Sequence, residues 1–343
     1  MQTRAEGRVN PNTILFVSHR EQQCGIYQYA VNLIEVLQTS SLYSFVYVEC
    51  SSERDLDQAV KQNNPAAIIY NYYPATMPWL SAQTTRRYGV PQLGVMHEVT
   101  QKDADEATQE MFDFHLCPDP TLVERNPSVF KTGRIVPSYF NKESTPDVVT
   151  IGSFGFGVGD KGFERLIETV QREFEVARII LNLPFNDIVD KEGAAFGLAT
   201  AERCRNVVNK PGIELIIRHD FLSKPELLNF LARNTLNAFF YDPHKDRGIS
   251  STIEYALAVQ RPLAITRCGM FRHVFSASPS ICIEDSTLKQ IISNGIVPLL
   301  PFTEAWSEAN FLKDYERILS DVFSRYQDES ASVSSPRAVP TWK

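Results

Sequence analysis

The chain has 343 residues, of which 43% are hydrophobic and 22% are charged, with a formal net charge of -7 and an isoelectric point near 5.5. A chain of this length and composition is expected to fold into about two globular domains with substantial cores. The acidic balance argues against a dedicated nucleic-acid-binding protein, which would normally present a basic face.

The cysteine pattern and the lack of targeting segments predict a reduced, cytoplasmic protein. The six cysteines are widely separated and include no C-x-x-C pair, so they favour free thiols and no zinc site. The first twelve residues lack the apolar core of a signal peptide, and no run of 18 apolar residues could span a membrane. We expect no metal, no cofactor and no nucleic-acid partner, and leave peripheral membrane contact open.

In the first half of the chain, short apolar runs alternate with segments of helical periodicity. The predicted strands are residues 13–18, 45–49, 66–70, 91–96 and 112–117. The predicted helices are residues 25–37, 56–62, 80–88 and 104–110. In the helix over 25–37, apolar residues recur on one face at helical spacing. Strands alternating with helices indicate a parallel sheet built from βαβ units.

Residues 137–147 (PSYFNKESTPD) are polar and rich in turn formers, which predicts a linker, and the strand-first pattern then restarts. Strands are predicted at 148–154, 177–183, 213–217, 236–241, 262–266 and 280–283. Helices are predicted from 162, and at 198–208, 224–232, 251–259, 288–294 and 304–326. We therefore expect an α/β protein with two Rossmann-like domains facing a cleft, over residues 1–142 and 143–326. Residues 327–343 are expected to form a mobile tail, and the last helix could pack back on the first domain.

Two segments of the first half follow predicted strands, where an open α/β sheet exposes its ligand-binding edge. In residues 19–30 (HREQQCGIYQYA), Cys24 and Gly25 precede a helix whose unpaired N–H groups could bind phosphate. The alternative is a plain strand-to-helix turn, because no G-x-G-x-x-G pattern is present. His97 also follows a strand and is a candidate catalytic residue, or else a structural histidine.

Residues 152–162 (GSFGFGVGDKG) join a strand to a helix through a turn with five glycines. Such a turn could enclose a diphosphate, with Gly157 close to the ligand and Lys161 supplying positive charge. The segment is not a Walker A loop, since Lys161 is followed by glycine rather than Ser or Thr. The alternative is a flexible turn with a solvated lysine.

Residues 242–266 (DPHKDRGISSTIEYALAVQRPLAIT) are the most informative segment. The candidate site residues are Asp246, Gly248, Ile249, Ser250, Ser251 and Glu254. Glu254 could accept hydrogen bonds from ribose hydroxyls, or it could complete an S-x-x-E capping box with Ser251. Under both interpretations, Glu254→Gln should leave the stability of the unliganded protein almost unchanged.

In this order, the motifs resemble glycosyltransferase family 4, a retaining family with the GT-B fold. The matching segments are KGFERLI (161–167), DFLSKPEL (220–227), Asp246-x7-Glu254, and the run from Ala256 to Ala264 that ends in RPLA, followed by the turn of Thr266 to Gly269. The resemblance implies a nucleoside-diphosphate-sugar donor bound by the second half and an unknown acceptor on the first. It also implies retention of configuration without a metal, with Lys161 stabilising the leaving phosphate and His97 across the cleft.

The sequence departs from the family at two positions. Asp246 stands where the family has glutamate, and Ser153 follows Gly152 where a basic residue often stands; Arg218 or Arg267 could compensate. These departures leave two alternatives open. One is another GT-B enzyme, such as an epimerase or an inverting transferase, and the other is a non-catalytic sugar- or nucleotide-binding protein with the same fold.

Overall fold

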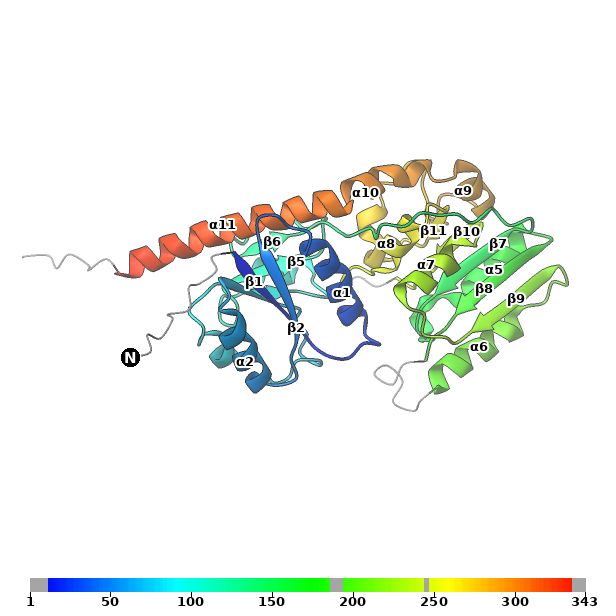
Figure 1. Cartoon of the computed structure of the whole chain (residues 1–343). Helices are drawn as coiled ribbons and strands as arrows, with labels where there is room; N and C mark the ends of the chain where they lie inside the picture. The colour runs from blue at the N-terminus through cyan, green and yellow to red at the C-terminus, as the bar shows by residue number, and fades with distance from the viewer. Residues whose placement is uncertain (1–11, 186–193, 244–246, 335–343) are drawn as a thin grey trace, which may run out of the picture.

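The computed structural model describes residues 12–185, 194–243 and 247–334, with side chains up to residue 328. Within these residues the chain forms two parallel sheets, of six and five strands, each covered by helices (Figure 1). None of the described helices is both long enough and apolar enough to cross a membrane.

The first sheet has the strand order β2-β1-β3-β4-β5-β6, and all its pairings are parallel. Its strands are β1 (Thr13–Ser18), β2 (Ser44–Glu49), β3 (Ala67–Tyr70), β4 (Gln92–Val95), β5 (Phe114–Cys117) and β6 (Val129–Lys131). Its helices are α1 (Gly25–Leu37), α2 (Glu53–Asn63), α3 (Ala82–Thr85) and α4 (Gln101–Glu106). Strand β6 was not predicted, because three residues are too short to show a hydrophobic pattern.

The second sheet has the strand order β11-β10-β7-β8-β9 and is also parallel. Its strands are β7 (Thr150–Phe154), β8 (Ala177–Asn182), β9 (Ile213–Arg218), β10 (Leu236–Phe239) and β11 (Leu263–Ile265). The helices around it are α5 (Phe163–Glu173), α6 (Ala195–Val207), α7 (Lys224–Ala232), α8 (Thr252–Ala258), α9 (Leu288–Asn294) and α10 (Leu300–Ala305).

The strand predicted at 280–283 is wrong. In the described chain this segment makes a single bridge, between Cys282 and Ile265, and no ladder. Pro279 has no N–H group to donate to a ladder, and the chain turns again directly after Ile283, where the amides of Asp285 and Ser286 donate to the carbonyl of Cys282. The segment therefore covers the edge of β11 without extending the sheet.

The end of the chain also differs from the prediction. The last helix, α11 (Glu308–Ser334), begins after α10 and a break at Trp306, and it continues through eight residues of the expected mobile tail. No glycine or proline interrupts the sequence between 309 and 335, so nothing local ends the helix earlier. Helix α11 packs against α1 and the first sheet through Phe311, Tyr315 and Ile318 (Figure 1).

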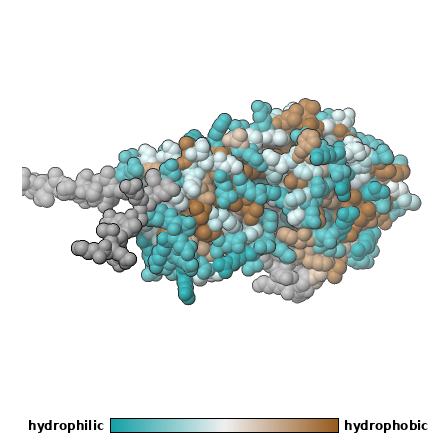
Figure 2. All heavy atoms as spheres, viewed as in Figure 1, coloured by the Kyte–Doolittle hydropathy of each residue, from teal (hydrophilic) through white to brown (hydrophobic). Residues whose placement is uncertain are grey.

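Large hydrophobic side chains are exposed more often in the second half of the chain than in the first. Leu42 and Val123 are the large exposed hydrophobic residues among 12–139, whereas the described residues from Phe140 to Leu300 include nine. Figure 2 shows the same asymmetry, because hydrophobic residues are more frequent over the C-terminal half of the face in view. One of these residues, Phe221, lines the cavity described next.

Candidate active site

A cavity of about 500 Å³ lies between the two sheets and is lined by residues from both halves of the chain. From the first half, its walls come from α1 and from the segments that follow β4, β5 and β6. From the second half, they come from the segments that follow β7, β8, β9 and β10. The cavity therefore lies at the carboxyl ends of parallel strands, which is where open α/β sheets bind ligands.

The predicted site residues fall into three groups. Those that line the cavity are Cys24, Gly25, His97, Lys161, Gly248, Ile249, Ser250, Ser251 and Glu254. Asp246 lies outside the described residues. Gly157 does not line the cavity, and the prediction that it contacts substrate is corrected: a Cβ atom there would lie 2.6 Å from the Cα of Gly197, so this glycine is needed for packing against α6.

His97 follows β4 and is held on two sides. Its Nε2 lies 2.8 Å from the Oδ1 of Asn71, and its ring lies edge-on to Tyr29 with 5.3 Å between centroids. Burial, followed by the positive charge of Arg134, lowers the pKa of His97 to about 3. The ring is therefore neutral near pH 7, and it can form hydrogen bonds without carrying charge.

Lys161 ends a short turn of 3-10 helix, Gly159–Lys161, between β7 and α5. Its Nζ lies 3.7 Å from the centroid of the Tyr241 ring, which positions the ammonium group by a cation–π contact. Gly162 follows with a φ of +63°, and a Cβ atom there would lie 1.9 Å from the carbonyl oxygen of Phe240. The turn that presents Lys161 therefore requires this glycine for both its backbone conformation and its packing.

Glu254 has a role that the sequence did not reveal. Arg134, from the segment after β6, donates from Nε to Oε1 at 2.7 Å and from Nη2 to Oε2 at 3.0 Å. Ser251 makes no capping hydrogen bond, and its hydroxyl accepts a bond from Arg134 at 3.1 Å. The capping-box interpretation is therefore wrong, since Glu254 is buried in a bidentate ion pair between the two halves of the chain.

The charge state of this pair follows from its surroundings. Burial alone would raise the pKa of Glu254, but Arg134 and the nearby His273 outweigh it and lower the pKa to about 2. Burial likewise works against the charge on Arg134, and the attraction of Glu254 overcomes it, so the pKa of Arg134 is raised. The ring of His273 lies 3.4 Å from Glu254, and burial lowers the pKa of this histidine. Both members of the ion pair are charged at neutral pH.

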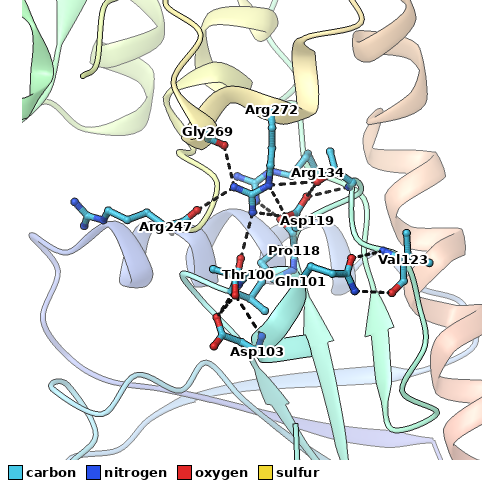
Figure 3. Close-up of polar contacts among 12 residues, drawn as sticks. Thr100, Gln101, Asp103, Pro118, Asp119, Val123, Arg134, Arg247, Gly269 and Arg272 are labelled. Carbon is cyan, nitrogen blue, oxygen red and sulfur yellow. Dashed lines mark hydrogen bonds and ion pairs between the residues drawn. The ribbon is translucent and has the colours of Figure 1, made fainter. Parts of the chain in front are cut away.

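A second ion pair joins the halves in the opposite sense (Figure 3). Arg272 comes from the second half, and its side chain binds the buried carboxylate of Asp119, which follows β5. Arg272 also donates to the carbonyl oxygens of Arg247 at 2.9 Å and of Val99 at 3.2 Å. In these two ion pairs each half supplies one arginine and one carboxylate, and together they hold the two cavity walls in their relative position.

Backbone contact between the walls is also tight. A Cβ atom at Gly248 would lie 2.3 Å from the Cα of Glu98, so only glycine fits at this position. Glu98 has a φ of 49°, in the left-handed region, and its carboxylate pairs with Arg247 at 2.9 Å. The loop of residues 248–251 is therefore in direct contact with the segment that follows β4, directly beside His97.

The compensating arginines suggested by the sequence are wrong. Neither Arg218 nor Arg267 lines the cavity, and Arg267 pairs with Asp285 instead. Besides Lys161, the arginine and lysine side chains that line the cavity among the described residues are Arg134 and Lys224. Lys224 forms an ion pair with Glu35 of α1.

Sequence reasoning missed several residues that shape the site: Asn71, Asp119, Arg134, Tyr241 and Arg272. Asn71 and Asp119 directly follow, or come two residues after, strands at the ligand-binding edge, and that position could have identified them. Nothing local identifies Arg134, because its partner is 120 residues away in the sequence.

The sequence matches no protein-family model and no curated protein. The fold does match solved structures. Anabaena HepE in complex with UDP aligns with a TM-score of 0.61 at 11% identity, covering 90% of this chain and all of HepE. The galactosyltransferase WaaB aligns at 0.58 and 12% identity, covering 90% and 99% of the two chains. A trehalose-phosphate synthase from Burkholderia xenovorans aligns at 0.61 and 9% identity, covering 91% and 100%. With its two parallel-sheet α/β domains around a shared cavity, the chain has the GT-B fold of these glycosyltransferases.

Proposed function

We propose that this protein is a glycosyltransferase that moves a sugar from a nucleoside-diphosphate sugar to an acceptor. The observation that carries the proposal is the cavity between the two sheets, which Lys161, the 248–251 loop and His97 all line. The structural neighbours add support, since HepE is described in complex with UDP and glucose. The division into an acceptor side, residues 1–142, and a donor side, residues 143–326, belongs to the same proposal.

The proposed chemistry needs positive charge beside the leaving diphosphate. As the glycosidic bond to phosphate breaks, negative charge grows on the leaving oxygen, and a fixed cation there stabilises the transition state. Lys161 fits this role, because Tyr241 positions its ammonium group and no described carboxylate forms an ion pair with it. With the protein supplying this charge, the reaction would need no metal, and we propose retention of configuration as in the family that the sequence resembles.

The remaining predicted residues have proposed roles on the same walls. Gly248, Ile249, Ser250 and Ser251 would contact the donor from one side, and Cys24 and Gly25 would approach it from the other. A Cβ atom at Gly25 would meet nothing within 4 Å, so packing does not explain this glycine, whereas a ligand close to the backbone would. We keep Asp246 as a sugar contact because Gly248, two residues later, lines the cavity. Glu254 stays in the proposal as a donor contact whose carboxylate is oriented by Arg134.

The test is nucleotide release from a panel of UDP- and GDP-sugars, combined with calorimetric binding of UDP and GDP. Lys161→Ala should weaken binding of the preferred nucleotide at least about tenfold, because a charge-assisted hydrogen bond contributes about 1.5–3 kcal/mol. Lys289→Ala is the matched control, since Lys289 makes a cation–π contact with Phe174 outside the cavity. Lys224 is unsuitable as a control because it lines the cavity. Equal affinities for the two variants would remove Lys161 from the proposed role.

A non-catalytic nucleotide-binding protein is the second candidate. One observation favours it: Ser153, where related enzymes often have a basic residue, is buried, and neither Arg218 nor Arg267 replaces that charge in the cavity. The same measurements separate the candidates. Tight nucleotide binding without release of nucleotide from any donor, in the presence of a broad acceptor mixture, would favour the binding protein.

A further inference from the structure

A buried hydrogen-bond network links the ends of two strands with the start of α1 and reaches His97. Its centre is Asn71, which follows β3 and is fully buried. The Nδ2 of Asn71 donates to the backbone carbonyl of Ile26 at 3.0 Å and to the hydroxyl of Ser18 at 3.1 Å. Its Oδ1 faces the Nε2 of His97 at 2.8 Å. A buried amide is costly unless its hydrogen bonds are made. A residue that only filled space at this position would therefore be expected to be apolar.

The partners of Asn71 determine which way its amide group points. The carbonyl of Ile26 can only accept a hydrogen bond, so the atom beside it must be the NH₂ group of Asn71. The oxygen of the amide therefore faces His97, and an oxygen of this kind can only accept. It follows that Nε2 of His97 carries the proton.

A neutral imidazole with a proton on Nε2 has an unprotonated Nδ1, which is a hydrogen-bond acceptor. The ring is kept neutral by burial and by two groups that disfavour a second positive charge, Arg134 and His19. Tyr29 packs edge-on against the ring and Asn71 is uncharged, and among the described residues no carboxylate offsets these effects. Among the described residues, no hydrogen bond is made to Nδ1 of His97, and His97 lines the cavity.

We infer that Asn71 is a positioning residue that holds His97 in the Nε2-protonated tautomer, so that Nδ1 accepts a hydrogen bond from a hydroxyl group of the sugar substrate. This inference rests on the proposed function for the identity of the ligand, but the tautomer can be measured without any substrate. His97 then acts as a neutral acceptor that selects a hydroxyl at one position of the sugar. It does not carry a proton during the reaction, because an imidazole that resists protonation is a weak base near neutral pH.

The first experiment measures the tautomer directly in the full-length protein. Ring-¹⁵N-labelled histidine gives separate signals for protonated and unprotonated nitrogens, and the His97 signals are assigned by their loss in His97→Asn.

Two other histidines of the protein serve as references for the two tautomers. His115 must be protonated on Nε2, which faces the carbonyl of Thr108 at 2.9 Å, and His219 on Nδ1, which faces the carbonyl of Leu183 at 2.9 Å. We expect the His97 signals to match the pattern of His115 and to stay constant between pH 6 and pH 8, about the range where a free imidazole titrates. A pattern like that of His219, or a mixture of the two, overturns the inference.

The second experiment changes Asn71. Asn71→Leu removes the acceptor, so His97 should become a mixture of tautomers while the His115 signals stay unchanged. Asn71→Asp keeps an acceptor but adds a negative charge, which should raise the pKa of His97. In the active enzyme, kcat/KM of Asn71→Asp should then fall on the acid side, where the wild-type profile is flat, and kcat/KM of Asn71→Leu should fall about tenfold at every pH.

The two variants also separate this inference from the proposed function. If Asn71→Leu does not fold, the wild-type spectrum and Asn71→Asp still decide the question. If no nucleotide sugar is turned over, the proposed function fails while the tautomer result stands on its own. An unchanged tautomer in Asn71→Leu, or a pH profile of Asn71→Asp identical to the wild type, would show that Asn71 does not control His97.

Discussion

The pattern S-x-x-E occurs at the start of two helices of the second half, and the two copies behave differently. At α7, the amide and hydroxyl of Ser223 donate to the carboxylate of Glu226 at 2.8 and 2.6 Å, and both residues are exposed. At α8, Ser251 makes no bond to Glu254, and both bind Arg134 from the other half of the chain. The same local pattern thus forms a helix cap at the surface and an ion pair between domains in the interior.

Burial accounts for the difference. An exposed carboxylate is solvated by water, and its hydrogen bonds to the N-cap residue of its helix add only modestly to stability. A buried carboxylate needs a full set of partners, because its desolvation costs several kcal/mol. Glu254 is 4% exposed, and the guanidinium of Arg134 meets both of its oxygens. The tertiary environment therefore determines whether a glutamate at the third helical position serves the helix or the domain contact.

The largest expected effect is on stability. Glu254→Gln leaves the charge of Arg134 buried without a counter-charge, so the free energy of unfolding should fall by about 3–5 kcal/mol. This corrects the expectation from the sequence that the substitution would leave stability unchanged. Glu226→Gln is the matched control, since Gln also serves at the third position of a cap, and it should change the free energy by less than about 1 kcal/mol. Urea denaturation followed by circular dichroism measures both. Equal losses for the two variants would contradict the contrast between cap and ion pair.

The pH dependence of stability sharpens the same contrast. The pKa of Glu254 is lowered to about 2 in the folded protein from an ordinary value of 4.5, so its contribution is fully present above about pH 4.5. It is lost as the pH falls from there towards 2, because the unfolded chain takes up the proton first. The difference in unfolding free energy between the wild type and Glu254→Gln should therefore shrink between pH 7 and pH 3. A constant difference over that range would mean that the carboxylate is not held in its charged form.

The smallest effect concerns the two serines. Ser251→Ala removes one acceptor of Arg134, and Ser223→Ala removes one donor to Glu226. Each should cost about 1 kcal/mol or less in unfolding free energy, because each loses one hydrogen bond. The serines should differ in their coupling. In double-mutant cycles, Ser251 should couple to Arg134 and Ser223 to Glu226. Coupling between Ser251 and Glu254 that persists when Arg134 is replaced by alanine would argue for the local interpretation.

Much of the fold could be predicted because hydrophobic periodicity is a local property. The strand β1 and the helices α7 and α9 fall at the residues expected for them, and most other elements agree within a few residues. The failures have local reasons too: β6 is too short to show a pattern, and the segment at 280–283 reads as a strand but makes a single bridge. Helix α11 runs past its predicted end, because low apolar content does not by itself end a helix.

The candidate site, like the fold, could be predicted from the sequence only in part. The sequence by itself determined which segments meet at the cavity, since His97, Lys161 and the 248–251 loop all follow strands, and the carboxyl ends of parallel strands share one edge of a sheet. It could not determine what each side chain contacts there. Glu254 meets Arg134 across 120 residues of sequence, and the Nε2 of His97 contacts the side chain of Asn71, 26 residues earlier. These partners come together only when the chain folds and its two halves pack, and that packing also determines which charged groups are buried away from water. Only the tertiary structure shows these two things.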